Sequence, residues 1–468
     1  MQQPLWPIES IAEVPAARNG REALQALLAQ DLDFRGEESG YASHNFHAFP
    51  AKFPPQLPRK FIYGLTEPGE TVLDPMVGSG TTVVEALLAG RRALGYDIDP
   101  LAVLASRVKT TPLDAAYVAA QRAAILRNAT LAIREGRAEL EAALDTRWDE
   151  ATRAFVDYWF TRDTQVELLA LLREIERIAE PATRDFFALA FSAIIVTKSG
   201  GVSLAFDLAH TRPHRAKVVY TRSGEIVARD GILAPEAARA PYLKKTLRSP
   251  LEEFEKRSLH NVRGLASVQP ARGCVGVSFG DAQALPLASE SVDLIVTSPP
   301  YASNAIDYMR AHKFSLVWLG YPVGELGRRR GAYIGGEAAR TARFEHLPTR
   351  TAQLVGEIGA LDTRKGQALR RYYSEMTRVL REMWRVLRPG KAAIVVVGSS
   401  VMRGRDTETH ACLAEIGQTL GFDVPTIGVR GLDRDRRMMP AAHKRDSGSQ
   451  IQQRMHEEYV IGFLKPTP

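Results

Sequence analysis

One stretch of the chain constrains the fold more than any other. Residues 71–100 read TVLDPMVGSGTTVVEALLAGRRALGYDIDP: a short β-branched run, a glycine-rich turn, a run with helical apolar spacing, and a second short run that ends in acid. This order predicts a strand, a turn, a helix and a strand. Such a unit opens a sheet whose strands are connected by helices, so the sequence predicts an α/β protein with a doubly wound sheet.

Three later apolar runs supply further strands of the predicted sheet. They are VDLIVTSPPY at 292–301, AAIVVVGSS at 392–400 and EEYVIGFLK at 457–465. Runs of this kind are typical of strands buried between two layers of helices, and such strands are mostly parallel. The sheet domain is therefore predicted to consist of residues 43–110 and 270–468, after an N-terminal extension of residues 1–42.

Two insertions are predicted within the sheet domain. The first insertion, residues 111–269, has the apolar spacing of helices through about residue 196. After that point it is rich in turn residues and scattered basic residues. The pattern favours a mainly helical insertion with a loop-rich later part. The second, residues 319–370, includes GRRRGAYIGG and is predicted to be irregular.

The composition argues against several classes of protein. The longest apolar stretch, 186–196, is shorter than the ~18–20 residues that a membrane-spanning helix needs, and no leader pattern opens the chain. The two cysteines, Cys274 and Cys412, supply neither a disulfide framework nor a paired metal-ligand spacing, so we expect a cytoplasmic protein. The net charge of +7 is compatible with a polyanionic partner without establishing one.

The turn at Gly78, Ser79 and Gly80 is a candidate ligand site. Glycine lets the backbone approach a ligand closely, and the amides that open the next helix favour electronegative groups, although the same turn also serves simply to pack a helix on a sheet. Asp97 ends the second strand, where doubly wound folds hold ribose hydroxyls. A pyrophosphate fits less well, because the turn lacks a P-loop lysine and follows the acidic Asp74. A ligand with a ribose and a positive sulfonium fits better.

Four segments together resemble successive motifs of the amino-methyltransferases of DNA. They are HNFHAFPAKFPPQLPRKF, LDPMVGSGTTVVEALLAGRRALGYDIDP, GDAQALPL and TSPPY. The resemblance implies a Rossmann-like methyltransferase sheet with an antiparallel final strand, and S-adenosyl-L-methionine as the methyl donor. It also implies the residues of the cosubstrate site: Asp74, Pro75, Gly78, Ser79, Gly80 and Thr81 for the methionine part, Asp97 for the ribose, Asp281 for the adenine, and Ala51, Lys52 and Phe53 in the segment that closes over the ligand.

The long insertion departs from the usual pattern of this family. The cosubstrate motifs come before the TSPPY motif in the chain, as in the alpha and gamma groups of the family. The alpha pattern, however, places its recognition region after the position of GDAQALPL, whereas residues 111–269 come before it. The insertion therefore stays a candidate for a recognition region, a clamp over DNA or a dimer surface.

Ser298, Pro299, Pro300 and Tyr301 match the catalytic tetrad of the family. They directly follow a predicted strand and would lie at the carboxyl end of the sheet, where doubly wound folds bind ligands. An exocyclic base amine is a poor nucleophile because its lone pair is conjugated with the ring, so the Ser298 hydroxyl and the Pro299 carbonyl are interpreted as acceptors for its protons. The prolines stiffen the backbone, and Tyr301 offers an aromatic face to a flipped base. A rigid turn after a strand is the structural alternative.

The tetrad begins with serine, as in the cytosine-directed members of the family. The resemblance therefore implies direct in-line methylation of cytosine N4 in double-stranded DNA, as part of a restriction-modification system. The alternatives are N6-adenine methylation of DNA or RNA, a catalytically inactive nucleic-acid-binding protein on the same fold, and a small-molecule methyltransferase. Neither cysteine lies in the Pro-Cys setting that covalent attack on a cytosine ring requires.

Several basic residues are candidates for contacts with DNA phosphates, although each group could equally form an ordinary solvated face. They are Arg212, Arg215, Lys217, Arg328, Arg329, Arg330, Arg436, Arg437, Lys444 and Arg445. His44 and His47 lack further ligands at metal spacing, so we interpret them as loop or capping residues and predict no metal. The predicted partners are double-stranded DNA and a separately encoded restriction endonuclease, in the cytoplasm of a prokaryote at the nucleoid.

Overall fold

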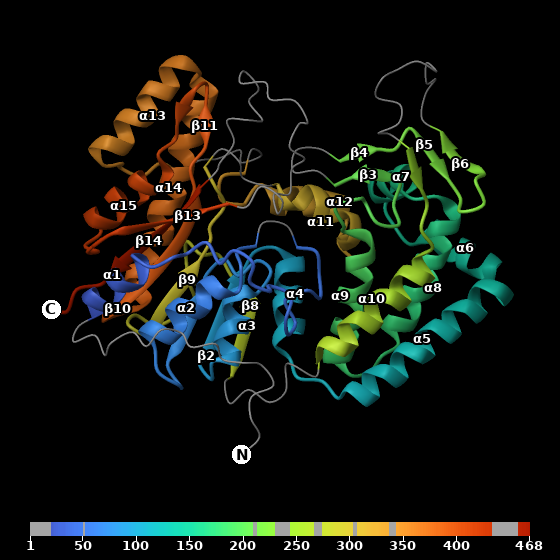
Figure 1. Cartoon of the computed structure of the whole chain (residues 1–468). Coiled ribbons are helices and arrows are strands. Elements are labelled where there is room, and N and C mark those ends of the chain that lie inside the picture. The colour runs from blue at the N-terminus through green and yellow to red at the C-terminus, as the bar shows by residue number, and fades with distance from the viewer. Residues whose placement is uncertain are drawn as a thin grey trace.

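A seven-stranded sheet forms the centre of the protein. The computed structural model describes residues 20–49, 52–208, 213–229, 244–265, 274–302, 307–336, 343–432 and 457–468. The strands lie in the order β13-β14-β10-β9-β1-β2-β8 (Figure 1). Their bounds are β1 Thr71–Asp74, β2 Arg92–Asp97, β8 Val275–Phe279, β9 Val292–Thr297, β10 Leu387–Gly398, β13 Ile427–Gly431 and β14 Glu457–Leu464. The pairs from β10 to β8 are parallel, and β14 is antiparallel to both of its neighbours, which confirms the predicted sheet.

The central strands are buried on both faces because helices cover each side of the sheet. Along β9, Ile295 packs into one hydrophobic core, whereas Leu294 and Val296 pack into the other. The first core is completed mainly by α14 Thr363–Val386 and α15 Thr409–Thr419. The second is completed by α1 Gly20–Leu28, α2 Gln56–Leu65, α3 Thr81–Leu88 and α4 Pro100–Thr110.

The first insertion forms a lobe beside the sheet (Figure 1). Its helices are α5 Ala115–Glu135, α6 Arg137–Thr146, α7 Glu150–Trp159, α8 Arg162–Glu176, α9 Pro181–Ile195 and α10 Pro250–Leu265. The later part, predicted to be loop-rich, contains short strands as well: β3 Ala205–Asp207, β4 His214–Arg215, β5 Val218–Tyr220, β6 Ile226–Arg229 and β7 Lys244–Thr246. Leu101 of α4, Phe186 of α9 and Phe314 of α11 (Tyr308–Leu316) belong to one core, so the lobe is packed directly onto the sheet domain. In the described residues, no helix is long and apolar enough to cross a membrane.

The second insertion differs from its predicted irregular structure, because helices cover much of residues 319–370. They are α12 Val323–Arg330, α13 Thr349–Leu361 and the beginning of α14. The α12 sequence contains two glycines and no side-chain cap, so its intrinsic tendency to form a helix is low. Contacts with other parts of the protein stabilise the helix. Leu326 is buried, and the Val323 N–H donates a hydrogen bond to Thr152 Oγ1 of α7 at 3.0 Å.

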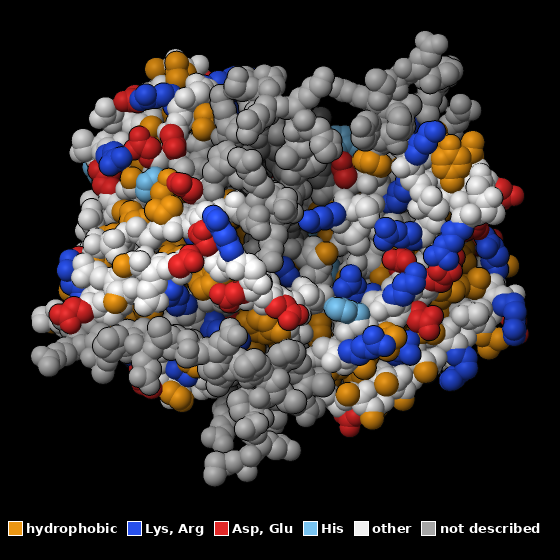
Figure 2. Space-filling view, viewed as in Figure 1, with side chains coloured by type: hydrophobic (Ala, Val, Ile, Leu, Met, Phe, Trp, Pro, Cys, Tyr) orange, Lys and Arg blue, Asp and Glu red, His pale blue; other side chains and the backbone are white. Residues whose placement is uncertain are grey.

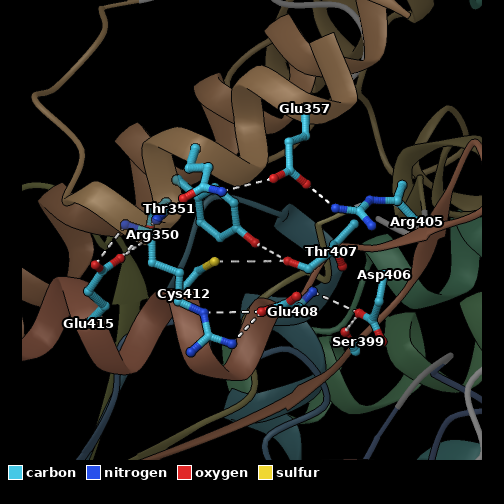
Figure 3. A network of polar contacts seen from close by, with 12 residues as sticks. Arg350, Thr351, Glu357, Ser399, Arg405, Asp406, Thr407, Glu408, Cys412 and Glu415 are labelled. Carbon is cyan, nitrogen blue, oxygen red and sulfur yellow. Dashed lines mark hydrogen bonds and ion pairs between the residues drawn. The ribbon is translucent and has the colours of Figure 1, made fainter. Parts of the chain in front are cut away.

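Polar contacts with α15 and with the hairpin of β11 Val401–Met402 and β12 Arg405–Asp406 anchor α13 (Figure 3). Glu415 of α15 accepts the N–H groups of Arg350 and Thr351, each at 2.9 Å, and so satisfies the uncapped first turn of α13. Arg405 of the hairpin pairs with Glu357 of α13. Tertiary contacts therefore replace the capping signals that are missing from the sequence around α13.

Candidate active site

A pocket lies at the carboxyl ends of β1, β2, β8 and β9, and the empty space in it, open solvent included, is about 870 Å³. The predicted cosubstrate residues that line it are Lys52, Phe53, Asp74, Pro75, Gly78, Ser79, Thr81, Asp97 and Asp281. Ser298 and Pro300 of the tetrad line the same pocket, whereas Gly80, Pro299 and Tyr301 do not. Ala51 lies outside the described residues. The two sites that the sequence predicts separately thus share one cavity.

The glycine-rich turn requires glycine at Gly78 and Gly80. Both residues have positive φ, 48° and 83°. A Cβ on Gly80 would lie only 2.8 Å from Ser106 Oγ, so the turn is pressed against α4. The buried Lys109 of α4 also holds the turn in place, because its Nζ donates a hydrogen bond to the Ser79 carbonyl at 2.7 Å. The turn is therefore rigid as well as close to the pocket.

Asp74 and Asp97 place two carboxyl groups on the wall of the pocket. Asp74 accepts from Thr297 Oγ1 at 2.7 Å, and burial raises its pKa to about 6. The Asp97 carboxylate accepts from the Gly78 N–H and the Asp99 N–H, each at 2.9 Å. Burial, followed by the neighbouring charge of Asp99, raises the pKa of Asp97 to about 7. Ionising these groups is costly because they are buried, so a cation or a pair of hydroxyl donors would be held strongly there.

The structure adds residues to the pocket that the motifs did not single out. Asp99 accepts from the N–H of Leu101 as the cap of α4 and contacts His312 Nδ1 of α11 at 2.6 Å. Burial alone would raise the pKa of Asp99, but the charge and the hydrogen bond of His312 outweigh it and lower the pKa. Phe49, Tyr308 and Tyr333 complete this wall. Two features of the sequence could have pointed to these residues: the acidic DIDP that ends at residue 100 contains Asp99, and GAYIGG contains Tyr333.

The segment before α2, which contains His44 and His47, is fixed to both the sheet domain and the helical lobe by buried polar contacts. His44 Nε2 lies 2.7 Å from Glu85 Oε1 of α3, and Tyr41 donates to the same oxygen at 2.7 Å. His47 Nε2 lies 3.0 Å from Ser192 Oγ of α9. Burial lowers the pKa of both histidines, which suits neutral hydrogen-bonding groups. In the described part of the chain, no three potential ligands gather as a metal site would require.

The arginines of α12 that are predicted to contact DNA differ in whether they already form ion pairs within the protein. Arg329 pairs with Glu325 at 2.8 Å, and Arg330 pairs with Asp307 at 2.5 Å. Arg328 is exposed, and among the described residues no ion pair of its side chain occurs. Two of these three arginines are therefore already partly neutralised.

Other candidate DNA contacts lie in the insertion or outside the described residues. Arg215 lies over the Tyr158 ring at 4.6 Å, and Lys217 follows it before β5. Figure 2 shows Lys and Arg side chains over the helical lobe with Asp and Glu among them, and pairs such as Arg162 with Asp145 at 2.8 Å offset their charge. The residues outside the described ones are Arg212, Arg436, Arg437, Lys444 and Arg445.

Comparisons with known proteins agree with the motifs in the pocket. A family model described as DNA methylase, N6_N4_Mtase, matches residues 5–106, which include the glycine-rich turn and Asp97. The type II methyltransferase M.MvaI of Kocuria varians is 23% identical over 405 residues, which cover 83% of this chain and 83% of that protein. M.BsoBI of Geobacillus stearothermophilus is 22% identical over 433 residues, 81% of this chain and 78% of the relative. M.BglI of Bacillus subtilis is 50% identical over 50 residues, 11% of this chain and 14% of the relative.

Proposed function

We propose that this chain, a DNA methyltransferase of the N4/N6 amino-methyltransferase family, transfers a methyl group from S-adenosyl-L-methionine to the N4 amine of cytosine in double-stranded DNA. The observation that carries the proposal is the single cavity in which the glycine-rich turn and Asp97 meet Ser298. A cavity of this kind would hold a nucleoside-bearing methyl donor beside a base amine, which is what transfer between two bound reactants requires.

The lining of the pocket supports a ligand with a ribose and a sulfonium. Asp97 would accept hydrogen bonds from ribose hydroxyls on lone pairs that its two backbone contacts leave open. The nearby carboxyl of Asp74 would lie in the field of the positive sulfonium, which lowers the cost of ionising it. Bound there, S-adenosyl-L-methionine supplies an electrophilic methyl group.

The tetrad supports an amine as the acceptor. The Ser298 hydroxyl oxygen, which lines the pocket, would accept a proton of the amine and so help to hold its lone pair toward the methyl carbon. The nitrogen forms its new bond to carbon as the bond between sulfur and carbon breaks, which leaves the electron pair of that bond on sulfur as a neutral thioether. The methylated amine then gives one proton to solvent. Because the pocket lies at the strand ends, the target base would have to leave the duplex to reach it.

The choice of cytosine rests on Ser298 as the first residue of the tetrad, which resembles cytosine-directed members of the family. The relatives over most of the chain are named type II methyltransferases, which supports a restriction-modification role with a separately encoded endonuclease.

The proposal is tested by incubating the protein with mixed-sequence DNA and S-adenosyl-L-methionine, digesting the DNA to nucleosides and weighing them. We expect N4-methylcytosine, and DNA incubated without the methyl donor is the control. A product that consists only of N6-methyladenine would overturn the choice of base, and unmethylated DNA would overturn the proposed reaction.

A further inference from the structure

A buried hydrogen bond joins α11, the helix that follows the tetrad, to the wall of the pocket. His312 Nδ1 of α11 lies 2.6 Å from Asp99 Oδ2, and the two side chains are 0% and 5% exposed. Asp99 lines the pocket, whereas His312 does not. The other carboxylate oxygen of Asp99 accepts from the Leu101 N–H at 2.8 Å. Each oxygen of this pocket carboxylate is therefore held by a group that lies outside the pocket lining.

The chemistry of the pair fixes which group donates. Burial would raise the pKa of Asp99, but the charge and the hydrogen bond of His312 outweigh it and lower that pKa, so Asp99 is ionised. An ionised carboxylate has no proton, so His312 Nδ1 carries one and donates it. Among the described residues, His312 Nε2 has no hydrogen-bond partner, so the bond to Asp99 is the one that orients the ring there.

Asp99 in turn holds Asp97, the residue that is proposed to bind the ribose. The Asp99 N–H donates to Asp97 Oδ1 at 2.9 Å, and the Gly78 N–H donates to Oδ2 at 2.9 Å. These two backbone groups orient the Asp97 carboxylate. A shift of Asp99 would therefore displace one of the two donors that set the direction of Asp97.

His312 also packs against aromatic residues of the pocket. The centre of its ring lies 4.8 Å from that of Phe49 and 5.9 Å from that of Tyr308, and both of these residues line the pocket. Ser315 Oγ donates to the His312 carbonyl at 3.2 Å and accepts from Ser192 Oγ of α9 at 2.9 Å. Helix α11 contacts both α4 and α9, so it lies between the sheet domain and the helical lobe and fixes His312 against the pocket wall (Figure 1).

We infer that His312 is a positioning residue for the binding of S-adenosyl-L-methionine: its hydrogen bond holds the Asp99 carboxylate in place, and Asp99 in turn orients Asp97 toward the ribose. This role rests on the proposed function. Without the donor on His312, the buried carboxylate of Asp99 would have to turn or take up a proton, because a buried charge without a partner is costly. Either change alters the wall of the pocket beside Asp97.

Two substitutions of His312 separate its hydrogen bond from its packing. Asparagine places an amide nitrogen near the position of Nδ1, whereas leucine fills the space without a donor. In calorimetric titrations we expect His312→Leu to raise the Kd for S-adenosyl-L-methionine about tenfold, the loss of one hydrogen bond to a charged group, and His312→Asn to raise it much less. In an Asp99→Asn chain, His312→Leu should raise the Kd little further. In methyl-transfer assays on mixed-sequence DNA, His312→Leu should raise the KM for the methyl donor and leave kcat near that of the wild type.

Phe314→Leu is the matched control. Phe314 is buried on the same helix, but it packs in the core of the helical lobe, 4.8 Å from the Trp159 ring. The smaller side chain should therefore lower the stability of the protein without changing the Kd for the methyl donor.

The outcomes are distinct. An unchanged Kd for His312→Leu, an equal rise for His312→Asn, or an equal rise for Phe314→Leu would overturn the positioning role while leaving the methyltransferase intact. Should His312→Leu not fold, His312→Gln, whose amide lies one bond farther from the backbone, must raise the Kd more than His312→Asn does. A wild-type chain that binds no S-adenosyl-L-methionine would overturn the proposed function and the positioning role together.

Discussion

Replacing Asp97 by Asn is expected to stabilise the free protein while weakening its binding of the methyl donor. Burial, followed by the charge of Asp99, raises the pKa of Asp97 from an ordinary value of 3.8 to about 7. The folded chain therefore holds this proton more tightly than the unfolded chain, and ionising Asp97 opposes folding. A difference of about 3 in pKa corresponds to about 4 kcal/mol as an upper limit.

Two features of the site reduce this limit. Asp97 faces the open pocket and is only partly shielded from solvent, which screens some of the penalty. In addition, an amide cannot accept from both the Gly78 and the Asp99 N–H groups, and one lost hydrogen bond costs about 1 kcal/mol. We therefore expect the free energy of unfolding to rise by about 1–2 kcal/mol at pH 8.

The gain should depend on pH in a defined direction. Above pH 7 the folded wild-type chain carries the full penalty of ionised Asp97. As the pH falls through about 7 that carboxyl takes up a proton in the folded chain, the penalty fades, and it is gone below the unfolded value of 3.8. Urea denaturation at pH 8 and pH 5 should thus show a smaller difference between variant and wild type at pH 5.

Two further measurements complete this test. Calorimetry at pH 8 should show weaker binding of S-adenosyl-L-methionine to Asp97→Asn, because the ribose hydroxyls lose a charged acceptor worth about 1.5–3 kcal/mol. Asp281→Asn is the matched control, since Asp281 lines the same pocket but is exposed, and its stability should not change. A variant that gains no stability at pH 8, or gains the same amount at pH 5, would refute the reasoning.

Three other variants test separate parts of the structure. Gly80→Ala should lower the free energy of unfolding by about 1–3 kcal/mol, because φ is 83° and the new Cβ would meet Ser106 at 2.8 Å; a normal thermal midpoint would contradict this. Ser298→Ala should bind S-adenosyl-L-methionine normally but lose about 100-fold in kcat in a labelled-methyl assay, and near-normal turnover would show that the amine lies elsewhere. Arg328→Ala should reduce the slope of log DNA affinity against log salt concentration by about one in anisotropy titrations. Arg330→Ala should reduce this slope less, because Arg330 is already paired within the protein. A slope for Arg328→Ala equal to that of the wild type would exclude Arg328 from the DNA surface.

The sequence by itself determined the sheet and the parts of the site that depend on it. The runs at β1, β9, β10 and β14 are apolar enough to be recognised locally, and the turn at Gly78 and Gly80 needs glycine for reasons of backbone conformation alone. Because parallel strands end at one edge of the sheet, Asp97 and Ser298 had to come near each other once their strands were assigned.

Tertiary structure alone decided the features that join residues far apart in the chain. Asp99 and His312, which are in contact, are 213 positions apart in the chain, and the hydrogen-bonded Tyr301 and Glu458 are 157 positions apart. No local sequence pattern predicts either contact. The first turn of α13 is capped by Glu415 from another helix, which explains why the region was predicted to be irregular. Local sequence fixes backbone preferences and periodicity, whereas the partner of a buried polar side chain is set only when the elements pack and leave it one group within reach.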